Sequence, residues 1–312
     1  MSTLTIAYVT SRLNPRIEWF FDSLALRLQE TPHLPTIRVV VVDYHHAKRS
    51  KDQFLKQVPK AVDEFFHVPP KPCVWQGPHR LTTEDYFAAA NTRNTALCLA
   101  PDGYIAYVDD LSILMPGWLT RVNLAILGDY VALGAYKKLK AMVVEKGKLI
   151  SAEEHPPGVD SRWKHGNVSM AVPANGSWMY GCSVALPVSA LLECNGWMEL
   201  GDTTGMGGED YLTGMLIERN GYHFKYDLSM LTLESEEAHH EEPPLKRIIE
   251  RGYHPDDSSV ALLNIVKNSD IRMHPGYASM REMRAEVLSG KPFPIVQIPE
   301  HNWYSGKRLS EY

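Results

Sequence analysis

The stretch "YIAYVDDLSILMPGWL", residues 104–119, decides how this chain folds. Its apolar start is typical of a strand that is buried on both faces of a sheet, and this run ends at two adjacent aspartates, Asp109 and Asp110. Pro116 follows in a position that suits the first turn of a helix, and residues 116–128 continue with helical spacing. A buried strand therefore stops at a pair of carboxylates, shortly before a helix.

Strands and helices alternate on the amino-terminal side of this stretch. The apolar patterns predict strands at 3–9, 36–44 and 63–68, and helices at 15–30 and 82–100. A β-α-β order of this kind favours a mostly parallel central sheet with helices on both faces. The sequence therefore predicts an α/β fold.

The pattern becomes more mixed after residue 130. We expect a hairpin at 142–150, an irregular loop rich in Pro, Gly and Asn at 151–177, and a strand with a short helix at 178–196. A glycine-dense loop with a second helix follows at 199–221, and final strands lie at 222–235. This part predicts a smaller mixed region beside the parallel strands, within the same domain.

Composition limits the possible partners. A net charge of -5 argues against a generic nucleic-acid surface, and only 45–51 and 137–140 are locally basic. No apolar run approaches the ~20 residues of a membrane helix, so we expect no membrane span. The four cysteines form no C-x-x-C pair, and the chain opens as a strand without a secretory signal. We therefore expect a cytoplasmic protein with reduced thiols.

The aspartate pair suggests a cation site. Ligands of open α/β sheets bind outside the carboxyl ends of the strands, which is where Asp109 and Asp110 are expected. Mg²⁺ and Mn²⁺ prefer oxygen ligands and often take one or two carboxylates together with substrate phosphates. The alternative is that the pair merely caps a turn.

Two further stretches carry candidate chemistry. "GMGGEDYLTGML" places Glu209 and Asp210 at a helix start after glycines, where they either cap the helix or supply a general base. "NTRNTAL" places Asn91 and Arg93 on the helix that leads to the aspartate strand. The fork of an arginine suits a diphosphate, although a surface arginine would look the same.

These motifs in this order resemble the nucleotide-sugar glycosyltransferases of the GT-A fold. The shared pattern is N-x-R-N-x-A-L, Y-I-A-Y-V-D-D, P-G-W-L, N-G-W and G-G-E-D, within residues 3–235. It is similar to the inverting family-2 glycosyltransferases. The stretch "YGCSVALPVSALLECNGWMELGDTTGMGGEDYLTGMLIERNGY" resembles the carboxyl domain of the β-1,4-galactosyltransferases.

The resemblance implies a division of the chain and a set of roles. It implies a GT-A domain over 1–240, with a nucleotide-sugar half at 1–128 and an acceptor half at 129–240, and a helical extension with a tail at 241–312 packed on the same domain. It implies a UDP-sugar donor and a divalent metal, Mn²⁺ or Mg²⁺. The implied donor-binding residues are Thr10, Arg12, Asp43, Asn91, Arg93 and Asp109, with Asp43 reading the base.

The implied catalytic base is Asp210, while Glu209 orients the acceptor or supports its loop. Asp110, with Asp109, matches the D-x-D metal motif, but the third position of that motif is Leu111. The family places a histidine ligand after the last strand. Glu234 occupies the matching position here, and we expect His239 or His240 to bind the metal, with Glu234 next.

The acceptor side also departs from the galactosyltransferases. Met206 stands where they carry a tryptophan before Gly207 and Gly208, so we expect Trp178, Tyr180 or Trp197 to supply the aromatic platform. The resemblance thus implies a metal-dependent, inverting transfer of a sugar to a hydroxyl. The acceptor could be a glycan, a protein or a hydroxymethylated nucleic-acid base. The alternatives are a non-catalytic module that binds nucleotide-sugars or glycans and, less favoured, a glycosidase with paired carboxylates.

Overall fold

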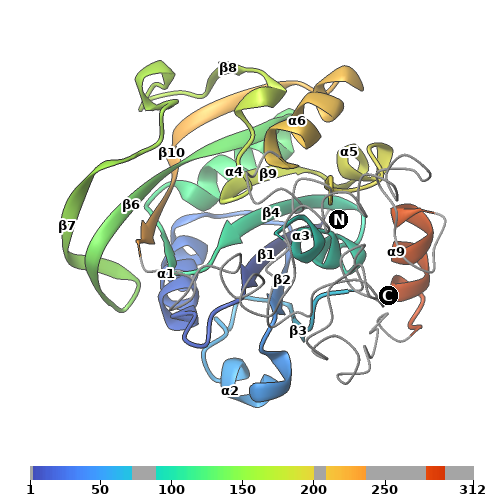
Figure 1. The fold of residues 1–312 in the computed structure, drawn as a ribbon, viewed down its shortest axis with the longest axis horizontal. Helices are drawn as coiled ribbons and strands as arrows, with labels where there is room; N and C mark the ends of the chain where they lie inside the picture. The colour runs from blue at the N-terminus through green and yellow to red at the C-terminus, as the bar shows by residue number, and fades with distance from the viewer. Residues whose placement is uncertain (1–2, 72–88, 200–208, 237–278, 292–312) are drawn as a thin grey trace, which may run out of the picture.

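A single mixed sheet forms the centre of the molecule, and helices cover both of its faces (Figure 1). The structure is a computed structural model that describes residues 3–71, 89–199, 209–236 and 279–291. Within these ranges the strand order is β3-β2-β1-β4-β9-β6-β10-β5, with β7 beside β6 and β8 beside β10. This architecture confirms the predicted α/β fold with a central sheet flanked by helices.

The strands fall into two parallel groups that one reversed strand joins. β3, β2, β1 and β4 run parallel, as do β6 and β10, whereas β9 runs antiparallel to both β4 and β6. The strands are β1 (Thr3–Thr10), β2 (Thr36–Asp43), β3 (Glu64–Val68), β4 (Gly103–Asp109), β5 (Ser112–Leu114), β6 (Val131–Glu145), β7 (Lys148–Val159), β8 (Val172–Ala174), β9 (Ser183–Pro187) and β10 (Phe224–Ser235).

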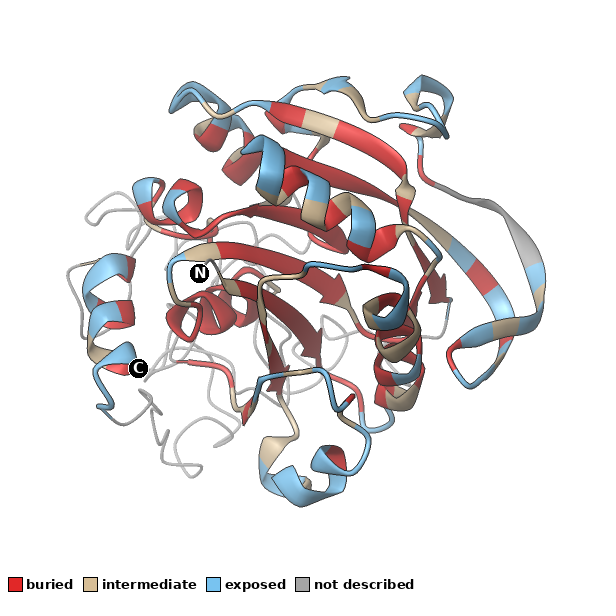
Figure 2. Ribbon diagram, turned by 180° about the vertical axis from the view of Figure 1, so that it is seen from behind, coloured by how far each residue is buried: buried red, intermediate tan, exposed pale blue. Residues whose placement is uncertain are grey.

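β4 is buried on both faces, as its apolar run predicts. Ile105 and Tyr107 belong to the core on one side, whereas Tyr104, Ala106 and Val108 belong to the core on the other. Side chains alternate along a strand, so this division follows directly from the sequence. Figure 2 shows the buried strands between helices whose outer faces are exposed.

Different helices cover the two faces. Buried residues of α3 (Ala89–Cys98), α5 (Val188–Glu193), α6 (Glu209–Arg219) and α9 (Met280–Leu288) join the core around Tyr107. Those of α1 (Ile17–Glu30), α2 (Lys51–Leu55) and α4 (Trp118–Gly128) join the core around Val108. Arg284 of α9 also donates to the Ala100 carbonyl and pairs with Asp102 at 2.7 Å. The division of the chain into domain halves stays a prediction.

The predicted hairpin at Lys146 and Gly147 is confirmed, because β6 and β7 pair around these two residues, which both have positive φ. The prediction of an irregular loop from residue 151 is wrong in its first part, because β7 continues to Val159. The strand contains Pro156 and Pro157. Its paired neighbour in the described sheet is β6, and an edge strand tolerates prolines because it needs fewer amide donors.

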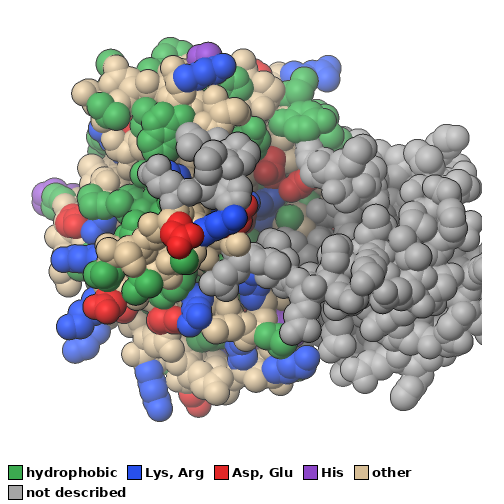
Figure 3. Space-filling view, turned by 60° about the vertical axis from the view of Figure 1, so that its left-hand side comes forward, with side chains coloured by type: hydrophobic (Ala, Val, Ile, Leu, Met, Phe, Trp, Pro, Cys, Tyr) green, Lys and Arg blue, Asp and Glu red, His purple; other side chains and the backbone are tan. Residues whose placement is uncertain are grey.

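No helix in the described ranges is both long enough and apolar enough to cross a membrane. Figure 3 shows Lys and Arg side chains interspersed with acidic ones over the described part of one face. On that face the described residues form no continuous basic patch of the kind that nucleic acids attract.

Candidate functional site

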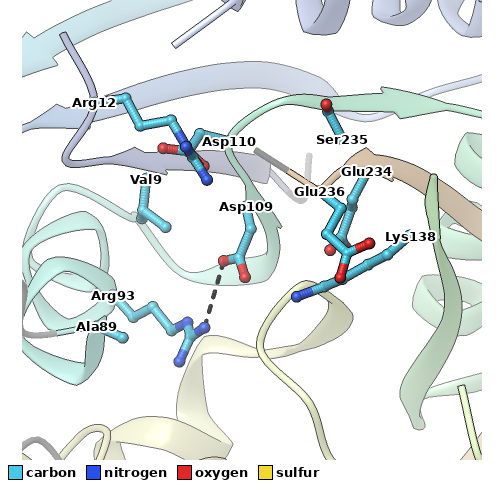
Figure 4. Close-up of a pocket in the computed structure, with 10 residues that line it drawn as sticks. All are labelled: Val9, Arg12, Ala89, Arg93, Asp109, Asp110, Lys138, Glu234, Ser235 and Glu236. Atoms are coloured by element: carbon cyan, nitrogen blue, oxygen red, sulfur yellow. Dashed lines mark hydrogen bonds and ion pairs between the residues drawn. The ribbon is translucent and has the colours of Figure 1, made fainter. Parts of the chain in front are cut away.

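The two aspartates at the end of β4 face different partners. The Asp110 carboxylate accepts hydrogen bonds from Arg12 Nε at 2.9 Å and from the Thr10 hydroxyl at 2.7 Å, so both of its oxygens are engaged. The Asp109 side chain is 36% exposed, and its carboxylate points toward Arg93 and the pocket (Figure 4). Of the two, Asp109 is the carboxylate that a ligand reaches more easily.

Leu111 explains why the chain turns without a third acid. Its side chain is fully buried, and its φ of 57° lies in the left-handed region that leucine rarely adopts. Its amide donates to the Tyr8 hydroxyl at 3.1 Å, and the Tyr8 hydroxyl donates to the Pro15 carbonyl. The chain then enters β5, which pairs antiparallel with β10 and was not predicted. The third position of the D-x-D pattern is therefore part of the core.

Arg93 gathers three carboxylates from distant parts of the chain. Its guanidinium lies 2.7 Å from Asp210, 3.1 Å from Glu209 and 3.4 Å from Asp109, and only 4% of its side chain is exposed. It also lies over the Trp197 ring at 5.0 Å, in a cation–π contact. In this structure the contacts of the two terminal nitrogens of Arg93 are with the chain's own acids, and the predicted role of Arg93 toward a donor stays a prediction.

Gly181 makes room for this arrangement. A Cβ atom at Gly181 would lie 2.0 Å from Arg93 Cζ, so no other residue fits here without displacing the guanidinium. The Gly181 amide also donates to Asp210 Oδ2 at 2.9 Å. The loop before β9 therefore contacts both members of the Arg93–Asp210 pair through Gly181.

The acids at the start of α6 differ in their pKa. Burial raises the pKa of Asp210 to about 7, and the charge of Glu209 adds to this against the opposing effect of Arg93. Burial also raises the pKa of Glu209, but the charge of Arg93 and the hydrogen bonds of the carboxylate together outweigh burial, so the net shift of this pKa is downward. Asp210 keeps a raised pKa despite its short contact with Arg93, because one guanidinium cannot neutralise three carboxylates.

A pocket of about 160 Å³ opens beside this cluster (Figure 4). Burial, followed by the charge of Asp109, raises the pKa of Glu234 in this pocket to about 8, whereas Lys138 lowers it. Carboxylates therefore outnumber the nearby cations. The pocket is lined by Val9, Arg12, Ala89, Arg93, Asp109, Asp110, Lys138, Glu234, Ser235 and Glu236.

The pocket offers a divalent cation oxygen ligands of the right chemistry. Asp109 and Glu234 both line it, and excess negative charge disfavours the ionised form of Glu234. Mg²⁺ and Mn²⁺ favour such carboxylates and would stabilise their ionised forms. Within the described ranges, however, no three His, Cys, Asp or Glu side chains are grouped as metal ligands. The predicted ligands His239 and His240 lie outside the described residues.

Three predicted donor residues do not line this pocket, namely Thr10, Asp43 and Asn91. Asp43 is fully buried, and its carboxylate accepts hydrogen bonds from Arg49 at 2.5 Å and from the His45 amide at 2.8 Å, and lies 3.0 Å from His67 Nε2. Although burial raises the pKa of Asp43, these partners lower it overall. Asn91 is also buried, where its side-chain amide donates to the Lys71 carbonyl. Their predicted roles toward a donor remain predictions.

The predicted acceptor residues form part of an aromatic group. Tyr180 packs against the Arg162 guanidinium at 4.2 Å and edge-on against Tyr136 at 5.9 Å. Trp178 packs edge-on against Tyr226 at 5.9 Å. Tyr180 directly precedes Gly181, so this group adjoins the Asp210 carboxylate. Met206, Gly207 and Gly208 lie outside the described residues.

Sequence reasoning missed several residues that build the site. Gly181 lies in the stretch that resembles the galactosyltransferases, and Lys138 lies in the locally basic stretch 137–140, but their proximity to Arg93 and Glu234 depends on long-range packing. The buried ion pair of Lys71 and Glu199, at 2.5 Å, was also missed. The side-chain amide of Asn94 donates a hydrogen bond to the same Glu199 carboxylate. The hint for this pair was Asn94, a polar residue on α3, where residues 90–98 are all buried.

Comparison with known proteins places the fold. No family model matches the sequence, and no curated protein matches it. S. aureus TarS 1–349 in complex with UDP is 15% identical, with 75% of this chain and 60% of that chain covered and a TM-score of 0.51. Its complex with UDP-GlcNAc is also 15% identical, with 76% and 59% covered and a TM-score of 0.50. The chain has the GT-A fold.

GalNAc-T7 with UDP, GalNAc and Mn²⁺ also appears in the comparison, with 12% identity, 94% of this chain and 58% of that chain covered, and a TM-score of 0.49. This chain thus spans about 60% of the length of the TarS structures that it matches. In the GT-A frame, Asp109 and Asp110 lie at the carboxyl end of a central strand, where ligands of open α/β sheets bind. The galactosyltransferase-like detail of the second half stays a prediction.

Proposed function

We propose that this chain is an inverting glycosyltransferase that uses a nucleotide-sugar, with a UDP-sugar as the expected donor. The observation that carries the proposal is the cluster in which Arg93 holds Asp109, Glu209 and Asp210 beside the pocket. The cluster joins the strand end where a nucleotide-sugar is expected to the helix start where an acceptor base is expected. The GT-A fold supports the same assignment but does not by itself fix an activity.

Asp210 is the proposed general base. Arg93 and the Gly181 amide each hold one of its oxygens, so the carboxylate is fixed in orientation while 19% of the side chain stays exposed. Its raised pKa, about 7, suits proton abstraction near neutral pH. In the proposed step the acceptor hydroxyl loses its proton to Asp210 as its oxygen attacks the anomeric carbon. The bond from that carbon to the diphosphate breaks, and the electron pair leaves with the diphosphate.

Asp109 and Glu234 are the residues that would hold a divalent metal, Mn²⁺ or Mg²⁺. We favour them over Asp110 because both oxygens of Asp110 already accept hydrogen bonds from Arg12 and Thr10. A bound ion at such a position supplies Lewis-acid stabilisation of the departing diphosphate. In this assignment Asp110 positions Arg12 at the pocket wall.

The acceptor is a hydroxyl compound whose class stays open among glycans, proteins and hydroxymethylated nucleic-acid bases. The half-buried aromatic rings of Trp178 and Tyr180 favour a glycan, since sugars stack on such rings. The interspersed charges of the described face give a nucleic-acid acceptor little support. The cytoplasmic location stays a prediction.

The experiment measures release of UDP from UDP-sugars in the presence of Mn²⁺. Asp210→Asn is expected to lower the rate by about 10² to 10⁴, the usual contribution of a general base, with little change in donor affinity. Arg219→Gln, at the other end of α6, is the matched control and should leave the rate unchanged. If the wild-type chain binds UDP-sugars but releases no UDP with any acceptor class, the chain is a binding module and the proposal is wrong.

A further inference from the structure

Three basic side chains line the pocket, and the chain's own acids already engage two of them. Arg12 pairs with Asp110 at 2.9 Å. Arg93 is shared among Asp109, Glu209 and Asp210. Lys138, in contrast, makes no ion pair with any residue that the structure describes. It is thus the pocket cation whose ammonium is available to a ligand.

The fold aims Lys138 at the pocket. β6 pairs in parallel with β10, and the register sets Lys138 directly opposite Glu234. Side chains that are opposite each other on adjacent strands lie on the same face of the sheet. Figure 4 shows the Lys138 ammonium extended into the space that Arg93, Asp109 and Glu236 border.

The chemistry of lysine fits an anion with several equivalent oxygens. An ammonium is a compact point charge with three donors on a flexible stem, so it follows a phosphate group that shifts as a bond breaks. An ammonium that merely neutralised Glu234 would be expected within ion-pair distance of its carboxylate. The structure instead leaves it extended into the pocket, which argues for a ligand.

We propose that Lys138 binds the diphosphate of the nucleotide-sugar donor. This inference rests on the proposed function and adds a residue to it. The ammonium donates hydrogen bonds to non-bridging phosphate oxygens in the bound donor. As the bond between the anomeric carbon and the diphosphate breaks, the same ammonium stabilises the negative charge that the diphosphate gains, so its contribution increases toward the transition state.

The test is a calorimetric titration with uridine, UMP and UDP at constant Mn²⁺. Lys138→Gln is expected to weaken UDP binding about tenfold, near the lower end for a charge-assisted hydrogen bond because the side chain is exposed, and to leave uridine binding unchanged. Lys138→Arg is expected to keep most of the UDP affinity, because it keeps the charge. Lys140→Gln is the matched control: it lies two residues further along the same face of β6, is exposed, and does not line the pocket.

Three outcomes overturn the inference. UDP affinity that stays within about twofold of wild type in Lys138→Gln removes the phosphate contact while the proposed function stands. An equal loss of uridine and UDP affinity shows that the substitution disturbs the pocket rather than a phosphate contact. If the wild-type chain binds neither UDP, GDP nor dTDP with Mn²⁺, the proposed function fails and the inference fails with it.

Discussion

Replacing Arg93 with glutamine should reveal how much the fold depends on one guanidinium. The substitution leaves Asp109, Glu209 and Asp210 close together without the charge that holds them. Removing one partner of a buried ion pair usually costs about 3 to 5 kcal/mol. The Asp109 carboxylate is 36% exposed and water screens it, so most of the cost arises at Glu209 and Asp210, whose side chains are 9% and 19% exposed.

The cost should depend on pH in a direction that the structure fixes. Arg93 lowers the pKa values of both Glu209 and Asp210, so its loss raises both. A carboxyl group whose pKa is raised in the folded state binds its proton more tightly there than in the unfolded chain. Its folded form therefore loses stability as pH rises through the interval between the two pKa values. Each unit of pKa rise makes about 1.4 kcal/mol of the loss pH-dependent.

Urea denaturation of wild type and Arg93→Gln at several pH values measures this. We expect a difference in the free energy of unfolding of about 3 to 5 kcal/mol near pH 8 that narrows steadily toward pH 5, where the acids of the variant are protonated. Arg219→Gln, an exposed arginine on α6, should differ from wild type by less than about 0.5 kcal/mol at every pH. A difference for Arg93→Gln that is the same at pH 5 and pH 8 would refute the account of Arg93 as the centre of a carboxylate cluster.

Two other predictions concern the same cluster. The value of kcat/KM for UDP release should rise with pH through about 7, because Asp210 must lose its proton to act as a base. This rise should be absent from the residual activity of Asp210→Asn. A wild-type profile that is flat from pH 5 to 9 would remove Asp210 from this role. Gly181→Ala should destabilise the protein by about 2 to 3 kcal/mol in urea and abolish UDP release, because its Cβ would lie 2.0 Å from Arg93 Cζ. The control is Gly221→Ala, whose Cβ meets no atom within 4 Å at a φ of +91°; it should cost about 1 to 2 kcal/mol and leave activity intact. Equal losses in both variants would contradict the crowding argument.

The sequence allowed the strand that ends at Asp109 and the helix start at Asp210 to be predicted, because both follow from local periodicity and glycine placement. The partner of Arg93 could not be predicted in this way. An arginine suits a diphosphate and a carboxylate equally well, and the choice depends on a contact between residues 93 and 210 that only the folded sheet creates. A local pattern thus identified the charged residues but not how they pair.

Short or atypical strands were the main errors in the predicted fold. β5 has three residues, which is too short for an alternating pattern to show. The second half of β7 contains Pro156 and Pro157, which in sequence indicate a loop. This segment can still be a strand because it lies at the edge of the described sheet, where prolines are tolerated. The edge position depends on how the strands pair, which the local sequence does not show. The role of Lys138 was missed for a similar reason, since its register opposite Glu234 is a property of the paired strands.

The reversed strand β9 has a consequence for how the chain is made. β1 to β4 emerge first from the ribosome, but the free edge of β4 gains its neighbour only when Val108 can pair with Ser183, much later in the chain. The pocket is completed later still, because Glu234 and its neighbours on β10 are among the last strand residues to appear in the described part of the chain. During this interval an apolar strand with unpaired amides and carbonyls is open to other chains. The order of the strands along the chain thus leaves one edge of this central strand unpaired until β9 has been made.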